Sequence, residues 1–365
     1  MKKICTVVGA RSQFIKLAMV SRVLRREFRE VLIHTGQHYD HNMSGVFFEE
    51  MDIPKPDYNL GISGGAHGQM TGQMLIEIEK VLIEERPDML LVFGDTNSTL
   101  AGALAAVKLH IPVCHVEAGN RLGTIENPEE VNRILTDHVS SLHLACTASG
   151  VDFLKREGFS TSICLVGDPM YDAFCYYSAR LDGSELAKLK GFDGSPISVP
   201  ENFYYMTCHR QENTDTDEKL DQIFQAMNSL DAPVVYPVHP RNHGRALRLR
   251  EAGGYENIIL TLPVGYRTSI SLVNRAKKII TDSGGLQREA FFAQKPCVTV
   301  FGWAAWPETM VNGCNRLAKP EKEDILAKLD APVQFDMSYQ PFGDGHSAEK
   351  IVEQIRTYWN RRETL

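Results

Sequence analysis

Apolar and polar stretches alternate along the whole chain in a regular order. Short apolar runs, each followed by a stretch of helical periodicity, are KICTVVGA, VLIHTGQ, DMLLVFGD, HIPVCHVEAG and SLHLACT. The same alternation resumes with FYYMTCH, APVVYPVHP, NIILTLP, KKIITD and KPCVTV. Continuous apolar runs joined by helices are typical of parallel sheets covered on both faces. The pattern therefore predicts an α/β protein with two Rossmann-like, doubly wound domains.

The alternation breaks at Gly167-Asp168-Pro169-Met170, and a polar stretch rich in Gly, Ser and Pro follows over residues 191–200. We expect a first domain over residues 1–170 and a second over 171–346, with a C-terminal helix in 347–365 that packs back on the first. A chain of 365 residues is long enough for two such domains. Ligands of open parallel sheets bind beyond the carboxyl ends of the strands, so we expect an interdomain cleft lined by strand ends.

Composition narrows the class of protein. With 43% apolar and 23% charged residues, the chain is typical of a soluble globular protein. The net charge of −7 and the scattered acids and bases argue against nucleic acid as a partner. No apolar run is long enough to span a bilayer and no signal peptide is visible, so we expect no membrane association. The eight cysteines contain no CxxC pair and indicate core residues in a reducing, cytoplasmic compartment.

The stretch KKIITDSGGLQREAFF is a candidate anion site. A strand ends there in Asp282, and Ser283, Gly284 and Gly285 lead into a helix. Free N–H groups at a helix start attract anions, and glycines let a ligand approach the main chain closely. Glu289 follows one turn later, where it could accept a hydrogen bond from a ribose hydroxyl. The pattern favours a nucleotide diphosphate, with a serine N-cap on a tight turn as the structural alternative.

Other predicted strand ends also carry polar side chains. Each alone has an ordinary explanation, such as an N-cap or a favourable helix dipole, but together they fall at the carboxyl edges of two sheets. The residues are Arg11, Lys16, Asp95, Glu117, Glu130, His209, Arg210 and His239. His34, His38 and His41 follow the second strand, but their spacing matches no standard metal site.

Nearly the whole chain, from Val7 to about Gly345, resembles a known family. GARSQFIK, HTGQHYD, GDTNSTLAGALAA, HVEAGNR, NPEEVNRILTDH, CHRQEN, HPR and TDSGGLQREA follow one another as in the non-hydrolysing UDP-N-acetylglucosamine 2-epimerases. The tracts HTGQHYDHNMS, FFEEMDIPKPDYNLGI and GQMTGQM look most similar to a branch acting on UDP-2,3-diacetamido-2,3-dideoxyglucuronate. The resemblance implies a glycosyltransferase-B arrangement, no metal, no redox cofactor, a homodimer, and a role in nucleotide-sugar metabolism for polysaccharide biosynthesis.

The resemblance also implies a chemistry. In the family, UDP is eliminated across carbons 1 and 2 of the sugar, and it adds back after carbon 2 is protonated on the other face. The motifs carry over Asp95, Glu117, Glu130 and His209 as the catalytic set, and they leave open which carboxylate removes the proton. The set that binds UDP and the sugar is Arg11, Lys16, Arg210, His239, Ser283, Gly284, Gly285 and Glu289. For His239, a role in structuring its loop is the alternative.

One segment departs from the family pattern. Residues 301–306 read FGWAAW where the family usually has Arg-Asp-x-Thr-Glu, so an arginine and a glutamate are missing. We expect this segment to line the sugar end of the site. Because of the departure, two other functions stay open: a glycosyltransferase that uses a UDP-sugar on the same architecture, and a UDP-sugar binder without catalysis.

Overall fold

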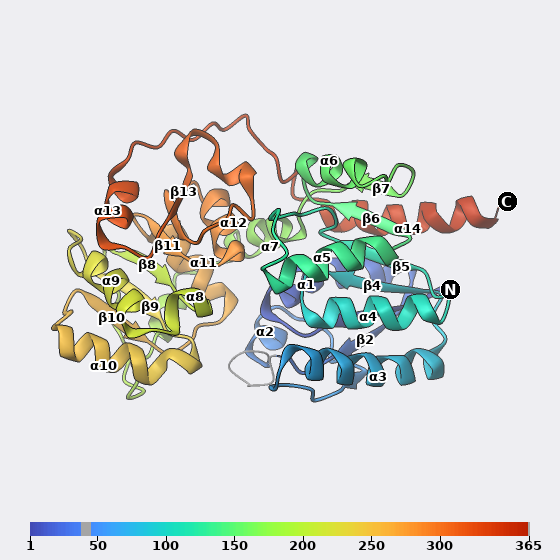
Figure 1. Cartoon of the computed structure of the whole chain (residues 1–365), viewed down its shortest axis with the longest axis horizontal. Helices are drawn as coiled ribbons and strands as arrows, with labels where there is room; N and C mark the ends of the chain where they lie inside the picture. The colour runs from blue at the N-terminus through green and yellow to red at the C-terminus, as the bar shows by residue number, and fades with distance from the viewer. Residues whose placement is uncertain (38–44, 364–365) are drawn as a thin grey trace. The chain divides into compact units, whose positions relative to one another are not determined.

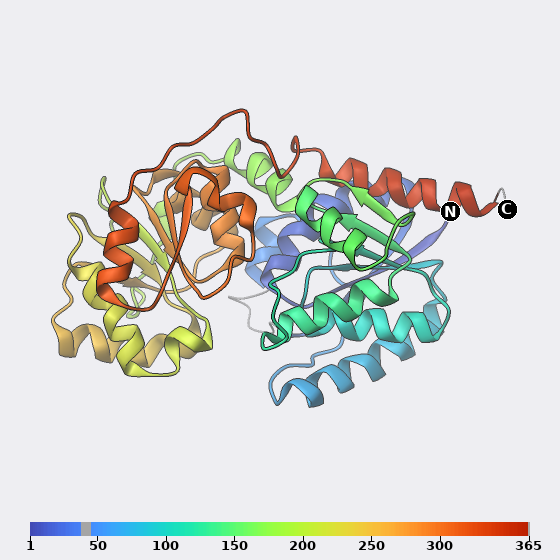
Figure 2. The same ribbon diagram turned by 45° about the horizontal axis from the view of Figure 1, so that its top comes forward.

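The computed structural model describes residues 1–37 and 45–363. The chain forms two compact units, each built on one parallel sheet (Figures 1 and 2). The first unit comprises Met1–Cys175 and Gln340–Leu365, and the second comprises Tyr176–Tyr339. The α/β class predicted from the sequence is confirmed.

The first unit holds a seven-stranded sheet in the order β3-β2-β1-β4-β5-β6-β7. Its strands are β1 (Lys3–Val8), β2 (Arg29–His34), β3 (Tyr58–Asn59), β4 (Met89–Phe93), β5 (Val113–Val116), β6 (Leu142–Ala145) and β7 (Ile163–Leu165). Its helices are α1 (Arg11–Glu27), α2 (Gly45–Glu50), α3 (His67–Glu85), α4 (Asn97–Lys108), α5 (Pro128–Val139), α6 (Ala148–Arg156), the start of α7 (Pro169–Ser178), and α14 (Ser347–Glu363).

Helices pack closely on this sheet. Strand β4 is buried along its whole length, which explains its uninterrupted apolar sequence. Helices α3, α4 and α5 pack side by side (Figure 1). At Gly102, α4 packs against the sheet, and a Cβ there would make ordinary contacts with Leu90 at 3.4 Å and Val7 at 3.5 Å.

The C-terminal helix α14 belongs to the first unit and packs against α1. The chain returns to this unit where Asp168 N–H donates to the Phe342 carbonyl at 2.9 Å. Arg356 on α14 then lies 3.4 Å from a carboxylate oxygen of Glu27.

The second unit holds a six-stranded sheet in the order β10-β9-β8-β11-β12-β13. Its strands are β8 (Tyr204–Thr207), β9 (Val234–Pro237), β10 (Ile258–Thr261), β11 (Ile279–Thr281), β12 (Cys297–Val300) and β13 (Asn315–Ala318). Its helices are η1 (Glu185–Lys188), α8 (Gln211–Thr214), α9 (Asp217–Asn228), η2 (Pro240–Asn242), α10 (His243–Gly253), α11 (Tyr266–Arg275), α12 (Gly284–Phe292), η3 (Pro307–Gly313) and α13 (Lys322–Asp330).

The sequence pattern predicts five strands in each half, and the structure adds β3, β7 and β13. All three lie at sheet edges. Edge strands are short or partly polar and so carry a weak apolar signal: β3 has two residues, and β13 reads Asn-Arg-Leu-Ala. None of the described helices is both long and apolar enough to cross a bilayer.

The strand orders locate where ligands should bind. Each order reverses direction at one place, between β1 and β4 in the first sheet and between β8 and β11 in the second. In open parallel sheets the crevice beyond such a reversal is the usual ligand site. Most of the candidate residues follow these four strands or the neighbouring β5.

Candidate active site

Lys16 and Glu117 form a buried ion pair in the first unit. Lys16 lies on α1 and is 1% exposed, and its ammonium contacts the carboxylate of Glu117 just after β5. Gly94 makes room for the pair, since a Cβ there would lie 3.3 Å from Lys16 Nζ and 3.5 Å from Glu117 Oε1. The buried ammonium thus places a positive charge against the Glu117 carboxylate.

The main chain of Glu117 is strained. Its φ of 75° is left-handed, which costs a residue other than glycine on the order of 1–2 kcal/mol. The N–H groups of Glu117 and Ala118 both donate to the Leu144 carbonyl, at 3.0 and 3.2 Å, and hold the turn in place. Strain of this kind concentrates at functional sites, so Glu117 is a candidate on geometry as well as on sequence.

Arg133 on α5 joins the other two candidate carboxylates. Its guanidinium contacts Asp95 after β4 and lies 3.0 Å from Glu130 Oε2. Burial by itself would lower the pKa of Arg133, but the charges of Asp95 and Glu130 raise it, so the side chain stays charged. We did not predict a role for Arg133, although its spacing of three from Glu130 on a helix was a usable signal.

Both carboxylate oxygens of Glu130 accept hydrogen bonds. Its Oε1 accepts the N–H groups of Leu122 at 2.7 Å and Gly123 at 2.9 Å, while Oε2 accepts from Arg133. The residue lies in the first turn of α5, where Asn127 caps the helix by accepting Glu130 N–H at 3.1 Å. Glu130 therefore organises the loop after β5 and the position of Arg133.

In the second unit, the Ser-Gly-Gly turn opens helix α12. Ser283 is the N-cap and accepts from Leu286 N–H at a long 3.4 Å. The first turn of a helix has no internal acceptors for its N–H groups, so those of Gly284 and Gly285 are available to an anion. Both glycines are partly exposed. Glu289, one turn later, is buried.

Asp282, at the end of β11, holds the neighbouring strand end. One carboxylate oxygen accepts the N–H groups of His209 and Arg210 at 2.8 and 2.7 Å, and the other lies 3.1 Å from His209 Nδ1. The Asp282 carbonyl accepts from Arg210 Nε at 2.7 Å. A hydrogen on His209 Nδ1 would face this carboxylate, which can therefore orient the ring. Sequence reasoning placed Asp282 at a strand end but gave it no role.

The chain matches the model of the UDP-N-acetylglucosamine 2-epimerase family over residues 22–356. It belongs to this family. A UDP-N-acetylglucosamine 2-epimerase homolog of Methanococcus maripaludis is 46% identical, covering 97% of this chain and 99% of its own length. The UDP-2,3-diacetamido-2,3-dideoxy-D-glucuronate 2-epimerase of Pseudomonas aeruginosa is 44% identical, with coverages of 97% and 99%.

Solved structures agree with the family assignment. The UDP-GlcNAc 2-epimerase of Methanocaldococcus jannaschii, in complex with UDP-GlcNAc and UDP, superposes with a TM-score of 0.89 at 39% identity, covering 98% of this chain and 99% of the other. MurG of Acinetobacter baumannii shares the fold, with a TM-score of 0.54 at 13% identity.

The segment that departs from the family pattern packs beside the Ser-Gly-Gly turn. Phe301 lies under the guanidinium of Arg210 at 4.0 Å, and Trp306 lies under that of Arg288 at 4.0 Å. A Cβ on Gly284 would lie 3.5 Å from Trp306 Nε1. The aromatic rings thus pack against two arginines near the start of α12. That this segment lines the sugar end of the site stays a prediction.

The remaining predicted residues have clear neighbours. Arg11 lies over the ring of Phe47 at 4.6 Å. The His239 ring stacks on that of His209 with centroids 6.2 Å apart, and it accepts from Arg241 N–H at 3.4 Å. Both roles considered for His239, in the site and in its loop, therefore remain open. His38 and His41 lie outside the described residues.

Glu117 also belongs to a set of potential metal ligands in the described part of the chain. Ligand atoms of Glu117, Cys146 and Asp168 lie within 4.8 Å of one another. The ammonium of Lys16 already contacts Glu117 and supplies a positive charge there.

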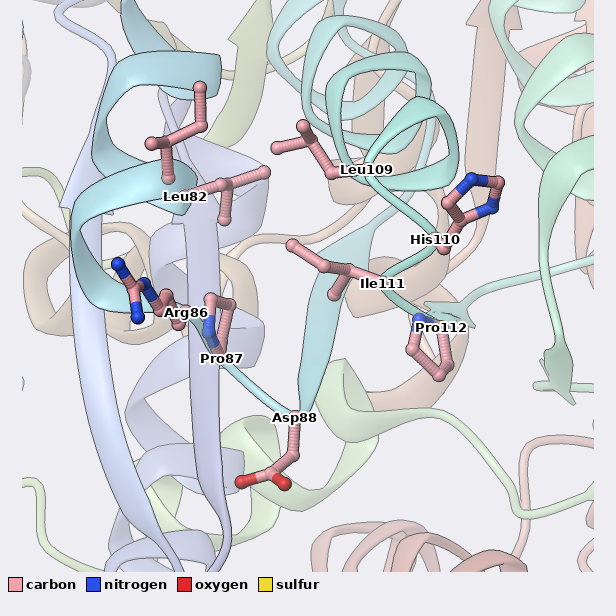
Figure 3. A pocket seen from close by; sticks show the side chains of 9 residues that line it. Leu82, Arg86, Pro87, Asp88, Leu109, His110, Ile111 and Pro112 are labelled. Carbon is pink, nitrogen blue, oxygen red and sulfur yellow. The ribbon is translucent and has the colours of Figure 1, made fainter.

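A pocket of about 400 Å³ lies elsewhere in the first unit (Figure 3). Leu82 and Arg86 at the end of α3 line it together with Leu109, Ile111 and Pro112. Asp88 and Pro112 directly precede β4 and β5, so this pocket lies at the amino ends of the strands. Ligands of this fold bind at the carboxyl ends, and the pocket is separate from the candidate site.

Proposed function

We propose that the protein is a UDP-N-acetylhexosamine 2-epimerase that interconverts UDP-GlcNAc and its carbon 2 epimer without a cofactor. The observation that carries the proposal is the set of paired acids and bases after β4 and β5, in a chain of this family. Glu117 is held by Lys16, and Asp95 by Arg133, so two carboxyl groups, each paired with a base, stand at adjacent strand ends.

The reaction balances without redox chemistry. A base removes the carbon 2 proton, the bond between carbon 1 and the diphosphate oxygen breaks, and a glycal and UDP are formed. An acid then protonates carbon 2 on the opposite face, and UDP re-forms its bond to carbon 1. Inversion needs proton-transfer groups on both faces of the sugar, because the proton cannot return from the side it left.

We assign these transfers to Asp95 and Glu117. Glu130 is engaged by two main-chain N–H groups and by Arg133, so we assign it a supporting role. General acid–base catalysis by a positioned group contributes about 10²- to 10⁴-fold in rate.

Residues of the second unit bind UDP. Glu289 binds the ribose, and the N–H groups of Gly284 and Gly285 take the diphosphate with Arg210. We also assign Arg11 to the set that binds the substrate. These donors stabilise charge that grows on the leaving diphosphate, and His209, oriented by Asp282, gives or takes a proton there.

A second candidate substrate has direct support. The diacetamido-glucuronate epimerase of Pseudomonas aeruginosa is nearly as similar to this chain as any relative described above. The same residues would invert carbon 2 of that sugar, whose acetamido group at carbon 3 and carboxylate need further contacts.

Hydrogen exchange tests the proposal. The protein is incubated in heavy water with UDP-GlcNAc, and separately with the diacetamido-uronate analogue, without any acceptor. An epimerase incorporates deuterium at carbon 2 and equilibrates the two epimers. A glycosyltransferase or a binder leaves carbon 2 unlabelled with both sugars, and that result would refute the proposal.

Three further expectations belong to this proposal. The enzyme is a homodimer, works in the cytoplasm, and supplies a polysaccharide pathway. Light scattering on the purified protein tests the dimer, and a monomeric mass would exclude it.

A further inference from the structure

A buried histidine connects the strand ends that carry the candidate carboxylates. His115 lies on β5 and its side chain is completely buried. Its Nε2 lies 2.7 Å from the Gly94 carbonyl, and its Nδ1 lies 2.6 Å from Asp137 Oδ1. Gly94 directly precedes Asp95, and Asp137 lies on α5, the helix that carries Glu130 and Arg133.

The two partners determine the protonation of the ring. A carbonyl oxygen only accepts, so Nε2 must carry a hydrogen. Burial alone would raise the pKa of Asp137, but the charge and hydrogen bond of His115, together with Arg121, hold it at about 2. Asp137 is thus a carboxylate, and both ring nitrogens of His115 are held by fixed partners.

Asp137 extends the connection to Glu117. Its second oxygen accepts Gly119 N–H at 3.0 Å and a nitrogen of Arg121 at 2.8 Å. Gly119 has φ 81° and lies two residues after Glu117, so this bond stabilises the left-handed turn that presents the Glu117 carboxylate. One ring and one carboxylate therefore join the turn before Asp95 to the turn after Glu117.

We propose that His115 is a positioning residue, which with Asp137 fixes the two carboxylates Asp95 and Glu117 relative to each other. The role rests on the proposed epimerase function, because His115 itself is too deeply buried to touch a sugar. A displacement of about 1 Å in a reacting group can cost on the order of 100-fold in rate. Positioning of this kind acts on kcat and leaves the nucleotide site of the other unit unaffected.

The chain offers a matched control in His143. It lies on β6 beside His115 in the strand register and is equally buried. Its ring bonds the Asp137 carbonyl and Ser162 Oγ, each at 2.8 Å, and the structure gives it no contact with Gly94 or Gly119 among the described residues. A glutamine at either position removes a buried, doubly hydrogen-bonded imidazole. Of the two imidazoles, only that of His115 bonds to the Gly94 carbonyl, next to Asp95.

The experiment compares His115→Gln with His143→Gln by kcat, KM, UDP affinity and thermal stability. We expect His115→Gln to lower kcat about 10- to 100-fold, with KM and UDP affinity within about threefold of wild type. We expect His143→Gln to lose comparable stability and to keep kcat within about threefold. Equal kcat losses in the two variants, or an unchanged kcat in His115→Gln, would overturn the proposal.

A second variant keeps the proposal testable if His115→Gln fails to fold. In Asp137→Asn, Gly119 and Arg121 hold the amide oxygen at the position of the second carboxylate oxygen, and the amide nitrogen faces His115. The ring keeps its bond to Gly94 and a hydrogen-bonding partner at Nδ1, so positioning survives and kcat should fall less than about fivefold. A larger loss would overturn the proposal, because these hydrogen bonds survive in the variant.

A readout without turnover separates this inference from the proposed function. Spectra of protein with isotope-labelled histidine should show a hydrogen on Nε2 of His115 in wild type and in Asp137→Asn, because the Gly94 carbonyl can only accept. A bare Nε2 in wild type would overturn the assignment. If wild type labels neither sugar at carbon 2, the epimerase proposal fails, while the spectra still decide whether His115 bonds to Gly94.

Discussion

Asp282→Asn should separate the orientation of His209 from the binding of UDP. Asp282 is only 1% exposed, and asparagine has the same shape as aspartate. Three donors converge on its Oδ2: the N–H groups of His209 and Arg210, and Asn213 Nδ2 at 3.4 Å. They will hold the amide oxygen of asparagine at that position, so its NH₂ group replaces the oxygen that faces His209 Nδ1.

The imidazole must then change its tautomer. Two donors cannot face each other, so Nδ1 gives up its hydrogen and Nε2 acquires one. If His209 exchanges a proton with the leaving group through Nε2, the variant starts each cycle in the wrong state. The loss of one acid–base group costs about 10²- to 10⁴-fold in kcat, and we expect a loss in this range. The main-chain bonds that shape the turn persist, so UDP affinity should stay within about threefold.

A double-mutant cycle provides the control. Deuterium incorporation at carbon 2 is measured for wild type, Asp282→Asn, His209→Asn and the double variant, with UDP affinity from calorimetry. If Asp282 acts through His209, the double variant is no slower than His209→Asn alone. Losses that multiply, or a kcat near that of wild type in Asp282→Asn, would refute this reasoning.

Three further predictions follow from other parts of the structure. Glu117→Gln should retain UDP binding and lose about 10²- to 10⁴-fold in turnover, and turnover near that of wild type would remove Glu117 from the catalytic set. Gly284→Ala has room within the protein, since its Cβ meets nothing closer than 3.5 Å. Calorimetry should show weaker UDP binding in this variant, because the added methyl group meets the ligand. Gly302→Ala, where a Cβ stands in open space, is the control, and equal UDP affinities in the two variants would place the nucleotide elsewhere. Burial among aromatic rings lowers the pKa of His34 from 6.5 to about 4. The unfolded chain therefore binds one more proton between these pH values, and the stability present above pH 6.5 is lost as the pH falls toward 4. Urea unfolding should show that the free energy of unfolding falls by about 2 kcal/mol by pH 5, and this loss should be absent in His34→Asn. The same pH dependence in wild type and in His34→Asn would refute this prediction.

The central strands were predictable because burial on both faces leaves a continuous apolar sequence. The neighbours within each sheet were predictable in principle as well. In a doubly wound sheet the first and fourth strands lie side by side, which in the second unit are β8 and β11. His209 and Asp282 end these two strands, so their proximity follows from topology. The contact of the Asp282 carboxylate with His209 does not follow from topology, because it depends on rotamers that the chain order does not determine.

The strain at Glu117 was not predictable from its own surroundings in the sequence. HVEAGNR contains a glycine, and Gly119 is left-handed with φ 81°, but the glutamate two positions earlier is left-handed as well, with φ 75°. What stabilises that turn comes from Leu144 and from Asp137, which is 18 residues after Gly119. Local propensity favours glycine at positive φ, and tertiary hydrogen bonds outweigh that preference here.

Helix α5 shows how one segment can determine several of these positions. Glu130, Arg133 and Asp137 are spaced by three and then four residues, so they lie on one face of the helix. That face meets the loop after β5 through Glu130, the end of β4 through Arg133, and Gly119 and His115 through Asp137. Because the three side chains share one rigid helix, a shift of α5 along its axis would displace all three contacts together. Together with the pairing of β4 and β5, the register of this one helix therefore holds the segments around Asp95 and Glu117 in place, and its start is fixed by the Asn127 cap and Pro128.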